Sequence, residues 1–144
     1  MGKNLNQDAE ARRDVLVHST VIAVVGMSDD PYYTSYEVGK YLEEVGYTVY
    51  PVNPTIEEID GNRTYKSLAD VPEPIDIVDV FRKSMYLPEI VDEAIAVGAK
   101  TVWAQETVHD DEAVQKALDA GLNIGTDICI RKEHKRLFRN MIQG

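Results

Sequence analysis

An uninterrupted run of apolar, mostly β-branched residues ends in a glycine near the start of the chain. The run is Val21–Val25, and Gly26, Met27 and Ser28 follow it. A run this short and this apolar predicts a strand buried on both faces, as in the centre of a parallel sheet. The glycine permits a tight turn and lets a ligand approach the backbone, because no Cβ stands in the way. Open α/β sheets bind nucleotides in such strand-to-helix loops, so this loop is the first candidate site.

Strands and helices alternate along the rest of the chain. Strands are predicted at residues 47–52, 75–81, 100–104 and 122–125, and helices at residues 8–17, 34–45, 87–97, 110–120 and from residue 131, with a helical turn near residues 67–70. Right-handed crossovers join such strands into one parallel sheet with helices on both faces. We therefore predict an α/β, Rossmann-like three-layer sandwich with a five-stranded parallel sheet in the order 3-2-1-4-5. One domain is expected over residues 1–144, with its core at about residues 20–134.

The charge balance limits the partners of the chain. Its 25 acidic and 15 basic residues leave a net charge of −10, which argues against nucleic acid as a partner because such binding depends on many Lys and Arg contacts. An anion site must therefore be local, built from backbone N–H groups and a few cations. The chain has no membrane-spanning apolar stretch and no secretory signal, so we expect a cytoplasmic protein without a membrane partner. The single cysteine, Cys129, excludes an internal disulfide.

Two common ligands of this fold class are disfavoured. A dinucleotide fingerprint needs Gly-x-Gly-x-x-Gly after the first strand and an acidic residue about 20 positions later. Here the first loop contains only Gly26–Ser28, and the second strand ends in Val52–Pro54. Asp29–Asp30 and Asp79 match two of the acidic positions of a phosphorylated receiver domain. Such a domain also needs a cation at the position where this chain has Asp127.

An ordered series of short motifs runs through the chain from about Val21 to His134. It consists of Gly26-Met-Ser28, Tyr50-Pro-Val-Asn-Pro54, Gly61, Tyr65, Ser67-Leu68, Asp79-Val-Phe-Arg82, Gly98-Ala-Lys100, Trp103-Ala-Gln105, Asp127-Ile-Cys129 and His134. The series resembles the small CoA-binding-domain proteins, which are similar to the CoA-binding domain of the succinyl-CoA synthetase alpha subunit. The resemblance implies a Rossmann-like fold with coenzyme A (CoA), or an acyl-CoA, across the carboxyl ends of the strands.

The resemblance also implies which residues contact the ligand. They are Gly26, Met27, Ser28 and Ser35 at the phosphates, Val52, Asn53 and Pro54 beside the adenosine, Phe81 and Arg82 over the ligand, and Trp103 and Gln105 near the pantetheine arm. Arg82 fits on chemical grounds as well, since a guanidinium directly after a buried strand can hold a phosphate in two-pronged geometry. The chain departs from the family at Asp29–Asp30, where cations or neutral residues are frequent, and at Thr107, where glycine is common.

The resemblance favours binding without catalysis. The ligase relatives keep a phosphorylated histidine in a separate domain, and none of His18, His109 and His134 lies in a matching glycine-rich loop. We therefore expect non-catalytic binding of CoA or an acyl-CoA.

Two alternatives stay open. One is a small enzyme acting on a CoA thioester or a nucleotide, for which the acid and base candidates are Asp79, Glu106, Asp127 and His109. The other is a docking subunit of a larger acyl-CoA ligase that uses the basic terminal helix. Apolar positions on that helix leave a homodimer open as well, and they are Leu137, Phe138, Met141 and Ile142.

Overall fold

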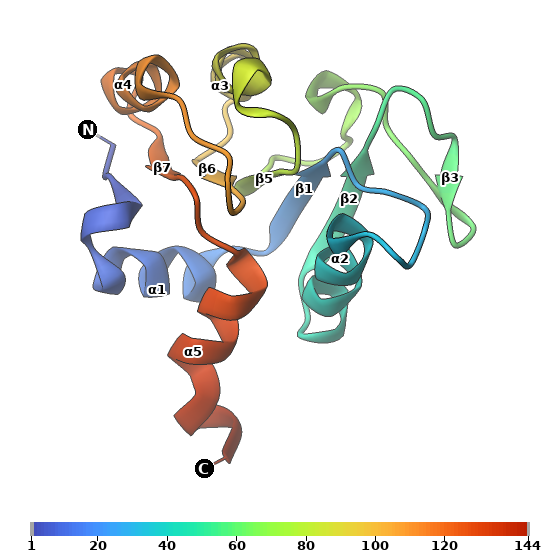
Figure 1. Cartoon of the computed structure of the whole chain (residues 1–144), viewed down its shortest axis with the longest axis horizontal. Coiled ribbons are helices and arrows are strands. Elements are labelled where there is room, and N and C mark those ends of the chain that lie inside the picture. The colour runs from blue at the N-terminus through green and yellow to red at the C-terminus, as the bar shows by residue number, and fades with distance from the viewer. Residues whose placement is uncertain (1, 144) are drawn as a thin grey trace.

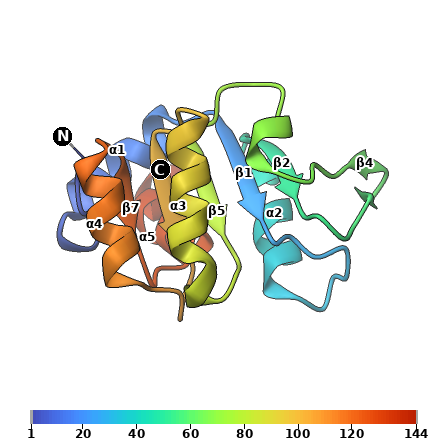
Figure 2. The same ribbon diagram turned by 90° about the horizontal axis from the view of Figure 1, so that it is seen from above.

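A parallel sheet forms the middle layer of the molecule (Figures 1 and 2). The computed structural model describes residues 2–143, and side chains as far as residue 139. Within this range five strands pair in the order β2-β1-β5-β6-β7, and β3 and β4 form a separate hairpin. The bounds are β1 Val21–Val25, β2 Thr48–Val52, β3 Glu58–Ile59, β4 Asn62–Arg63, β5 Ile77–Val80, β6 Thr101–Ala104 and β7 Asn123–Gly125.

Helices cover both faces of the sheet. They are α1 Ala9–His18, α2 Thr34–Glu44, α3 Leu87–Ala96, α4 Asp111–Asp119 and α5 Ile130–Gln143. Helices α3 and α4 lie on one face, and α1, α2 and α5 lie on the other (Figure 1). Strand β5 contributes to both layers, because Val78 and Val80 join the cluster under α3 and α4 while Ile77 joins the opposite cluster. In the described part of the chain, no helix is long and apolar enough to span a bilayer.

The predicted α/β, Rossmann-like class is confirmed. Every predicted strand and helix is present, with boundaries within two residues of those expected. The apolar positions of the terminal helix are partly internal, because Leu137 and Phe138 pack against the cluster beneath α5. The side chains of Met141 and Ile142 lie outside the described residues.

The strand order corrects one detail of the prediction. The strand at residues 77–80 pairs with β1 and so fills the fourth place of the Rossmann order 3-2-1-4-5, not the third. The third place, outside β2, holds a one-residue bridge between Tyr65 and Val52. Burial explains the choice: all four residues of β5 are buried, whereas β2 is partly exposed and contains Pro51, which suits an edge strand.

Asp76 holds the start of β5 against β1. Its Oδ2 accepts hydrogen bonds from the backbone N–H groups of Thr20 (2.8 Å) and Val21 (2.9 Å). Its Oδ1 lies 3.3 Å from Nζ of Lys100, which precedes β6. Burial raises the pKa of the Asp76 carboxyl, but these hydrogen bonds lower it by more, so the net pKa lies below the ordinary value of 3.8.

We expect the Asp76→Ala variant to lose about 1–3 kcal/mol of unfolding free energy at neutral pH, because two backbone donors lose their acceptor. Urea denaturation measures the loss. Since the folded-state pKa is lowered, the contribution of Asp76 is complete above the unfolded-state pKa and disappears as pH falls through the folded-state pKa. The difference in unfolding free energy between wild type and Asp76→Ala should therefore disappear at acidic pH. Asp92→Ala, which removes an exposed ion pair with Lys116, should cost less than about 1 kcal/mol.

Candidate functional site

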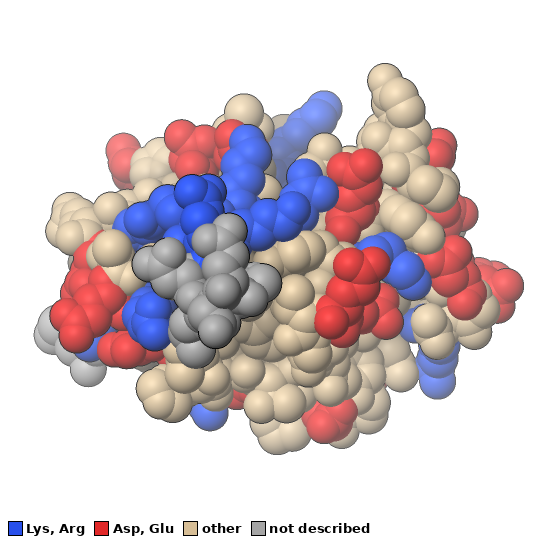
Figure 3. Space-filling view, turned by 90° about the horizontal axis from the view of Figure 1, so that it is seen from below, with Lys and Arg blue, Asp and Glu red and all other residues tan. Residues whose placement is uncertain are grey.

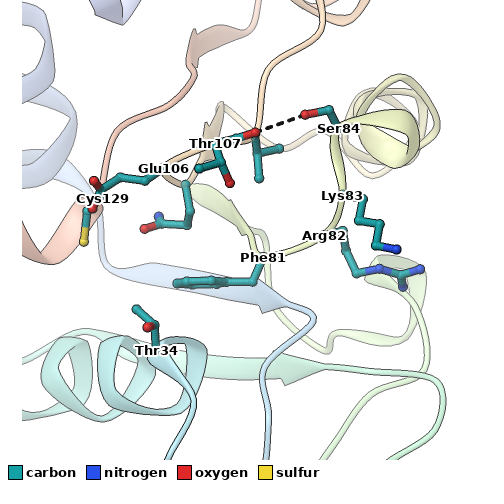
Figure 4. Close-up of a pocket in the computed structure, with 10 residues that line it drawn as sticks. Thr34, Phe81, Arg82, Lys83, Ser84, Glu106, Thr107 and Cys129 are labelled. Carbon is teal, nitrogen blue, oxygen red and sulfur yellow. Dashed lines mark hydrogen bonds between the residues drawn. The ribbon is translucent and has the colours of Figure 1, made fainter.

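The loops that follow the strands enclose a cavity of about 650 Å³ at the carboxyl edge of the sheet. Figure 4 shows Thr34, Phe81 and Cys129 around one part of it, and Arg82 and Lys83 extending to the other side. Its walls come from the start of α2, the loop after β5, the loop after β6 and the residue before α5. The lining residues are Thr34, Phe81, Arg82, Lys83, Ser84, Gln105, Glu106, Thr107, Val108 and Cys129.

Two further cavities adjoin this one through shared residues. A cavity of about 440 Å³ shares Thr34 and Phe81 with it and is lined also by Gly26, Ser28, Tyr33, Ser35, Asn53 and Ile56. A cavity of about 210 Å³ shares Arg82 and is lined also by Val25, Val52, Pro54, Lys66, Ser67, Tyr86, Glu89, Ile90 and Glu93. Together they form a cleft along the ends of β2, β1, β5 and β6. An extended ligand with several chemical groups fits such a cleft better than a compact one.

Gly26 brings the first loop against the end of β5. Its φ is +85°, a left-handed conformation that favours glycine, and a Cβ there would lie 2.6 Å from the carbonyl oxygen of Phe81. The side chain of Arg82 is also near, with its Cδ 3.1 Å from the same point. Glycine is therefore required for this close packing, and it leaves the loop backbone open toward the cavity.

Hydrogen bonds hold the first loop in one shape. The Ser28 amide donates to Oγ of Ser35 (3.0 Å), and Nδ2 of Asn53 donates to the carbonyl oxygen of Met27 (3.1 Å). Tyr33, the N-cap residue of α2, makes no side-chain cap, and the amides of Tyr36 and Glu37 bond to its carbonyl oxygen. The amides of Thr34 and Ser35 are therefore the ones left for a ligand at the cavity that both residues line. The carboxylates of Asp29–Asp30 are exposed. The loop therefore offers an anion the positive end of a helix dipole.

The loop after β6 is held in a strained conformation at Thr107. Its φ is +74°, which is unfavourable for a β-branched residue. Its amide donates to Oδ1 of Asp127 (2.6 Å), and its carbonyl oxygen accepts from Oγ of Ser84 (3.2 Å), the bond drawn in Figure 4. Neighbouring loops thus fix the backbone where glycine would sit without strain.

We expect Thr107→Gly to raise the unfolding free energy by about 0.5–1 kcal/mol, because relief of left-handed strain of about 1–2 kcal/mol exceeds the entropy that glycine adds to the unfolded chain. Thr107 is exposed, so little packing is lost. Thermal and urea unfolding measure the change. Thr48→Gly, at an exposed position in β2, is the matched control and should destabilise. A loss of stability in Thr107→Gly would contradict the strain argument.

A buried carboxyl group lies beneath the cleft. Asp79 is completely buried on β5, its Oδ1 accepts a hydrogen bond from Nε2 of Gln105, and its Oδ2 has no partner among the described residues. Oε1 of Gln105 faces the amide of Ile130 at 3.4 Å, where α5 begins. Burial raises the pKa of the Asp79 carboxyl well above 3.8, and the bond from Gln105 opposes this. We therefore expect Asp79 to retain its proton where an exposed aspartate has lost it.

Replacing Asp79 by asparagine should stabilise the protein at neutral pH. A raised folded-state pKa makes wild-type stability fall as pH rises above the unfolded-state pKa, by up to about 1.4 kcal/mol per pH unit. The amide of the substituted side chain cannot ionise, so the advantage of Asp79→Asn should grow as pH rises above the unfolded-state pKa of Asp79. Urea unfolding at a series of pH values from about 4 upward measures it. Asp119→Asn, on the exposed side of α4, is the control, and equal pH slopes for wild type and Asp79→Asn would contradict the expectation.

The structure brings most of the predicted contact residues to the cleft. Those that line its cavities are Gly26, Ser28, Ser35, Val52, Asn53, Pro54, Phe81, Arg82 and Gln105. Met27 and Trp103 are placed elsewhere. Met27 is 2% exposed and packs under Gly39, and Trp103 is 0% exposed with its indole N–H donating to the carbonyl oxygen of Ile128 (3.0 Å). Both side chains belong to the core, where they pack beneath the helices that cover one face of the sheet.

Several cleft residues have no motif that would reveal them in the sequence. Lys66 lies on the long connection after β2, whose path depends on the Tyr65 bridge. Tyr86 lies in a short 3-10 helix after β5. The sequence could have indicated Ser84 as a cleft residue, because it closely follows Arg82 in the same loop.

The acid and base candidates are engaged by other groups. Glu106 pairs with Lys132 (2.8 Å), and Asp127 accepts from the Thr107 amide. The two ring nitrogens of His109 contact Asp111 and Thr126, each at 2.7 Å. Within residues 2–143, no group of three or more His, Cys, Asp and Glu side chains is arranged to hold a metal ion.

Sequence comparison relates the chain to CoA proteins. A family model described as a CoA binding domain matches residues 20–135. The uncharacterised protein YneT of Bacillus subtilis is 41% identical over 122 residues, which cover 85% of this chain and 90% of that protein. The alpha subunit of ADP-forming acetate–CoA ligase II of Pyrococcus furiosus is 38% identical over 82 residues, which cover 56% of this chain and 18% of the subunit. The chain thus spans less than a fifth of that ligase subunit.

Solved structures agree with this relation. A hypothetical protein from Pyrococcus horikoshii superposes with a TM-score of 0.89 at 41% identity, covering 96% of this chain and 98% of that one. The dinucleotide-forming acetyl-coenzyme A synthetase 1 of Ca. Korarchaeum cryptofilum, in complex with phosphate and ADP, superposes with a TM-score of 0.71 at 27% identity. That match covers 80% of this chain and 27% of the synthetase chain.

Proposed function

The chain belongs to the family of CoA-binding domains, and from this premise we propose that it binds CoA or an acyl-CoA in the cleft without catalysing a reaction. The observation that carries the proposal is the cleft itself. The 650 Å³ cavity shares residues with the other two, one of which has the start of α2 and Gly26 in its wall and the other Val52, Pro54 and Arg82. CoA likewise consists of separate groups, an adenosine and a pantetheine arm joined by a diphosphate, and these groups can occupy different cavities.

Arg82 joins two of the cavities and supports a role in holding the diphosphate. Its guanidinium carbon lies 4.5 Å from the centre of the Tyr86 ring, and among the described residues it forms no ion pair. A guanidinium that already rests on an aromatic ring loses little conformational freedom when it binds a phosphate. The first-turn N–H groups of α2 approach the same region from the neighbouring cavity, which Phe81 shares.

We expect Arg82→Gln to weaken CoA binding by at least about tenfold, since a hydrogen bond to a charged group contributes about 1.5–3 kcal/mol. Isothermal titration of the purified protein with CoA measures the affinity, and NAD and ATP serve as comparison ligands. Arg139→Gln removes the same charge from an exposed position on α5 and should leave the affinity unchanged. Unaltered CoA affinity in a folded Arg82→Gln variant would count against the proposed site.

The absence of catalysis in this proposal is supported by the state of the ionisable groups. Glu106, Asp127 and His109 are held by other protein groups, and Asp79 is sealed below the cleft. A general acid or base needs access to the substrate and a pKa near the working pH. We expect no turnover of acetyl-CoA or succinyl-CoA in a thiol-release assay. Turnover that disappears in Asp127→Asn would favour the enzyme alternative instead.

A further inference from the structure

Three cations at the cleft have no carboxylate partner among the described residues. In that part of the chain, Lys66, Arg82 and Lys83 form no ion pair, although acidic residues outnumber basic ones by 25 to 15. Elsewhere in the range that the structure describes, some cations, such as Lys3, Arg63 and Lys135, are also without an ion pair, but seven others lie within 3.5 Å of a carboxylate oxygen: Arg12, Lys40, Lys100, Lys116, Arg131, Lys132 and Arg136. Figure 3 shows one face of the molecule, on which Lys and Arg side chains gather beside acidic ones. On α5, carboxylates pair with Arg131, Lys132 and Arg136, so these cations differ from those at the cleft.

The unpaired cations occupy different parts of the cleft. Of the three cleft cavities, Lys83 lines only the 650 Å³ one, Arg82 lies between that cavity and the 210 Å³ one, and Lys66 lines the 210 Å³ cavity. Lys66 is also the residue directly after the Tyr65 bridge, which anchors its backbone beside the end of β2. The cleft thus has a basic group, Lys66, in a cavity that the start of α2 does not line. A ligand with a second, separate phosphate would satisfy it.

The 210 Å³ cavity suits a nucleoside. Val52 and Pro54 supply apolar contact, and the Tyr86 ring forms part of the wall. Glu89 and Glu93 of α3 also line this cavity, and their carboxylates repel a phosphate but accept hydrogen bonds from an amino or hydroxyl group. The cations that line the same cavity are Lys66 and Arg82, so a phosphate here is favoured near one of these two groups.

We propose that Lys66 binds the ribose 3′-phosphate of the ligand, so that the 210 Å³ cavity selects a 3′-phosphorylated adenosine over an unphosphorylated one. The inference rests on the proposed function and extends it, because CoA differs from dephospho-CoA, ADP and ATP by this phosphate monoester. Because Arg82 is assigned to the diphosphate, Lys66 is the cation of this cavity that remains for a separate phosphate. The lysine ammonium group acts as a point charge, so it can bind a phosphate monoester without a fixed geometry.

The test compares CoA with dephospho-CoA by isothermal titration of the full chain. Wild type should bind CoA about tenfold more tightly than dephospho-CoA, the difference expected from one charge-assisted contact. In Lys66→Gln, CoA affinity should fall to the dephospho-CoA level while dephospho-CoA affinity stays unchanged, and Lys66→Arg should restore the preference. Lys3→Gln is the matched control, because Lys3 is exposed and its backbone pairs with the β7 segment near Asn123, at the opposite end of the sheet.

The possible outcomes distinguish a failure of the Lys66 assignment from a failure of the proposed function. Equal binding of CoA and dephospho-CoA by wild type would overturn the Lys66 assignment and leave the proposed function intact. A Lys66→Gln variant that weakens both ligands equally would also overturn it, because the contact would then lie elsewhere on the ligand. Failure of wild type to bind either ligand would overturn the proposed function together with the inference. Thermal unfolding midpoints establish that each variant is folded.

Discussion

The contact between Gly26 and the carbonyl of Phe81 organises the carboxyl edge of the sheet. A Cβ at Gly26 would come within 2.6 Å of that oxygen, so the first loop and the loop after β5 can pack this closely only because a side chain is missing. Close packing brings the start of α2, Phe81 and Arg82 around the same space. Both neighbouring cavities use Phe81 as a wall. The cleft thus depends on a backbone contact more than on any single polar group.

The cleft carries local positive charge although the chain as a whole is acidic. The chain carries a net charge of −10, yet the centre of the cleft offers helix N–H groups, Arg82 and Lys83, while Asp29–Asp30 are exposed to solvent. Screening by salt limits the repulsion from distant carboxylates to about 10 Å, so a few nearby donors can dominate. Burial raises the pKa of the Asp79 carboxyl, which favours its uncharged form beneath the cleft.

Local patterns were sufficient for the secondary structure and for much of the cleft. Apolar runs and helix-ending glycines placed each strand and helix, and the ends of several strands marked loops that line a cavity, as with Gly26, Asn53 and Arg82. Met27 and Trp103 contribute their side chains to the core and not to the cleft cavities. Each lies in a motif beside the cleft, but its side chain points into the core, where an apolar group of that size gains more from burial.

The sequence by itself determined the Rossmann-like class, the family and the loops that carry the site, because periodicity, glycines and motifs are local properties of the chain. Only the tertiary structure decided that the strand at residues 77–80 lies beside β1, since Asp76 bonds across from one strand to the other and Tyr65 takes the outer place next to β2. The same bridge brings Lys66 into the cleft. Contacts between residues far apart in the chain depend on which surfaces pack together, and no local pattern encodes that choice.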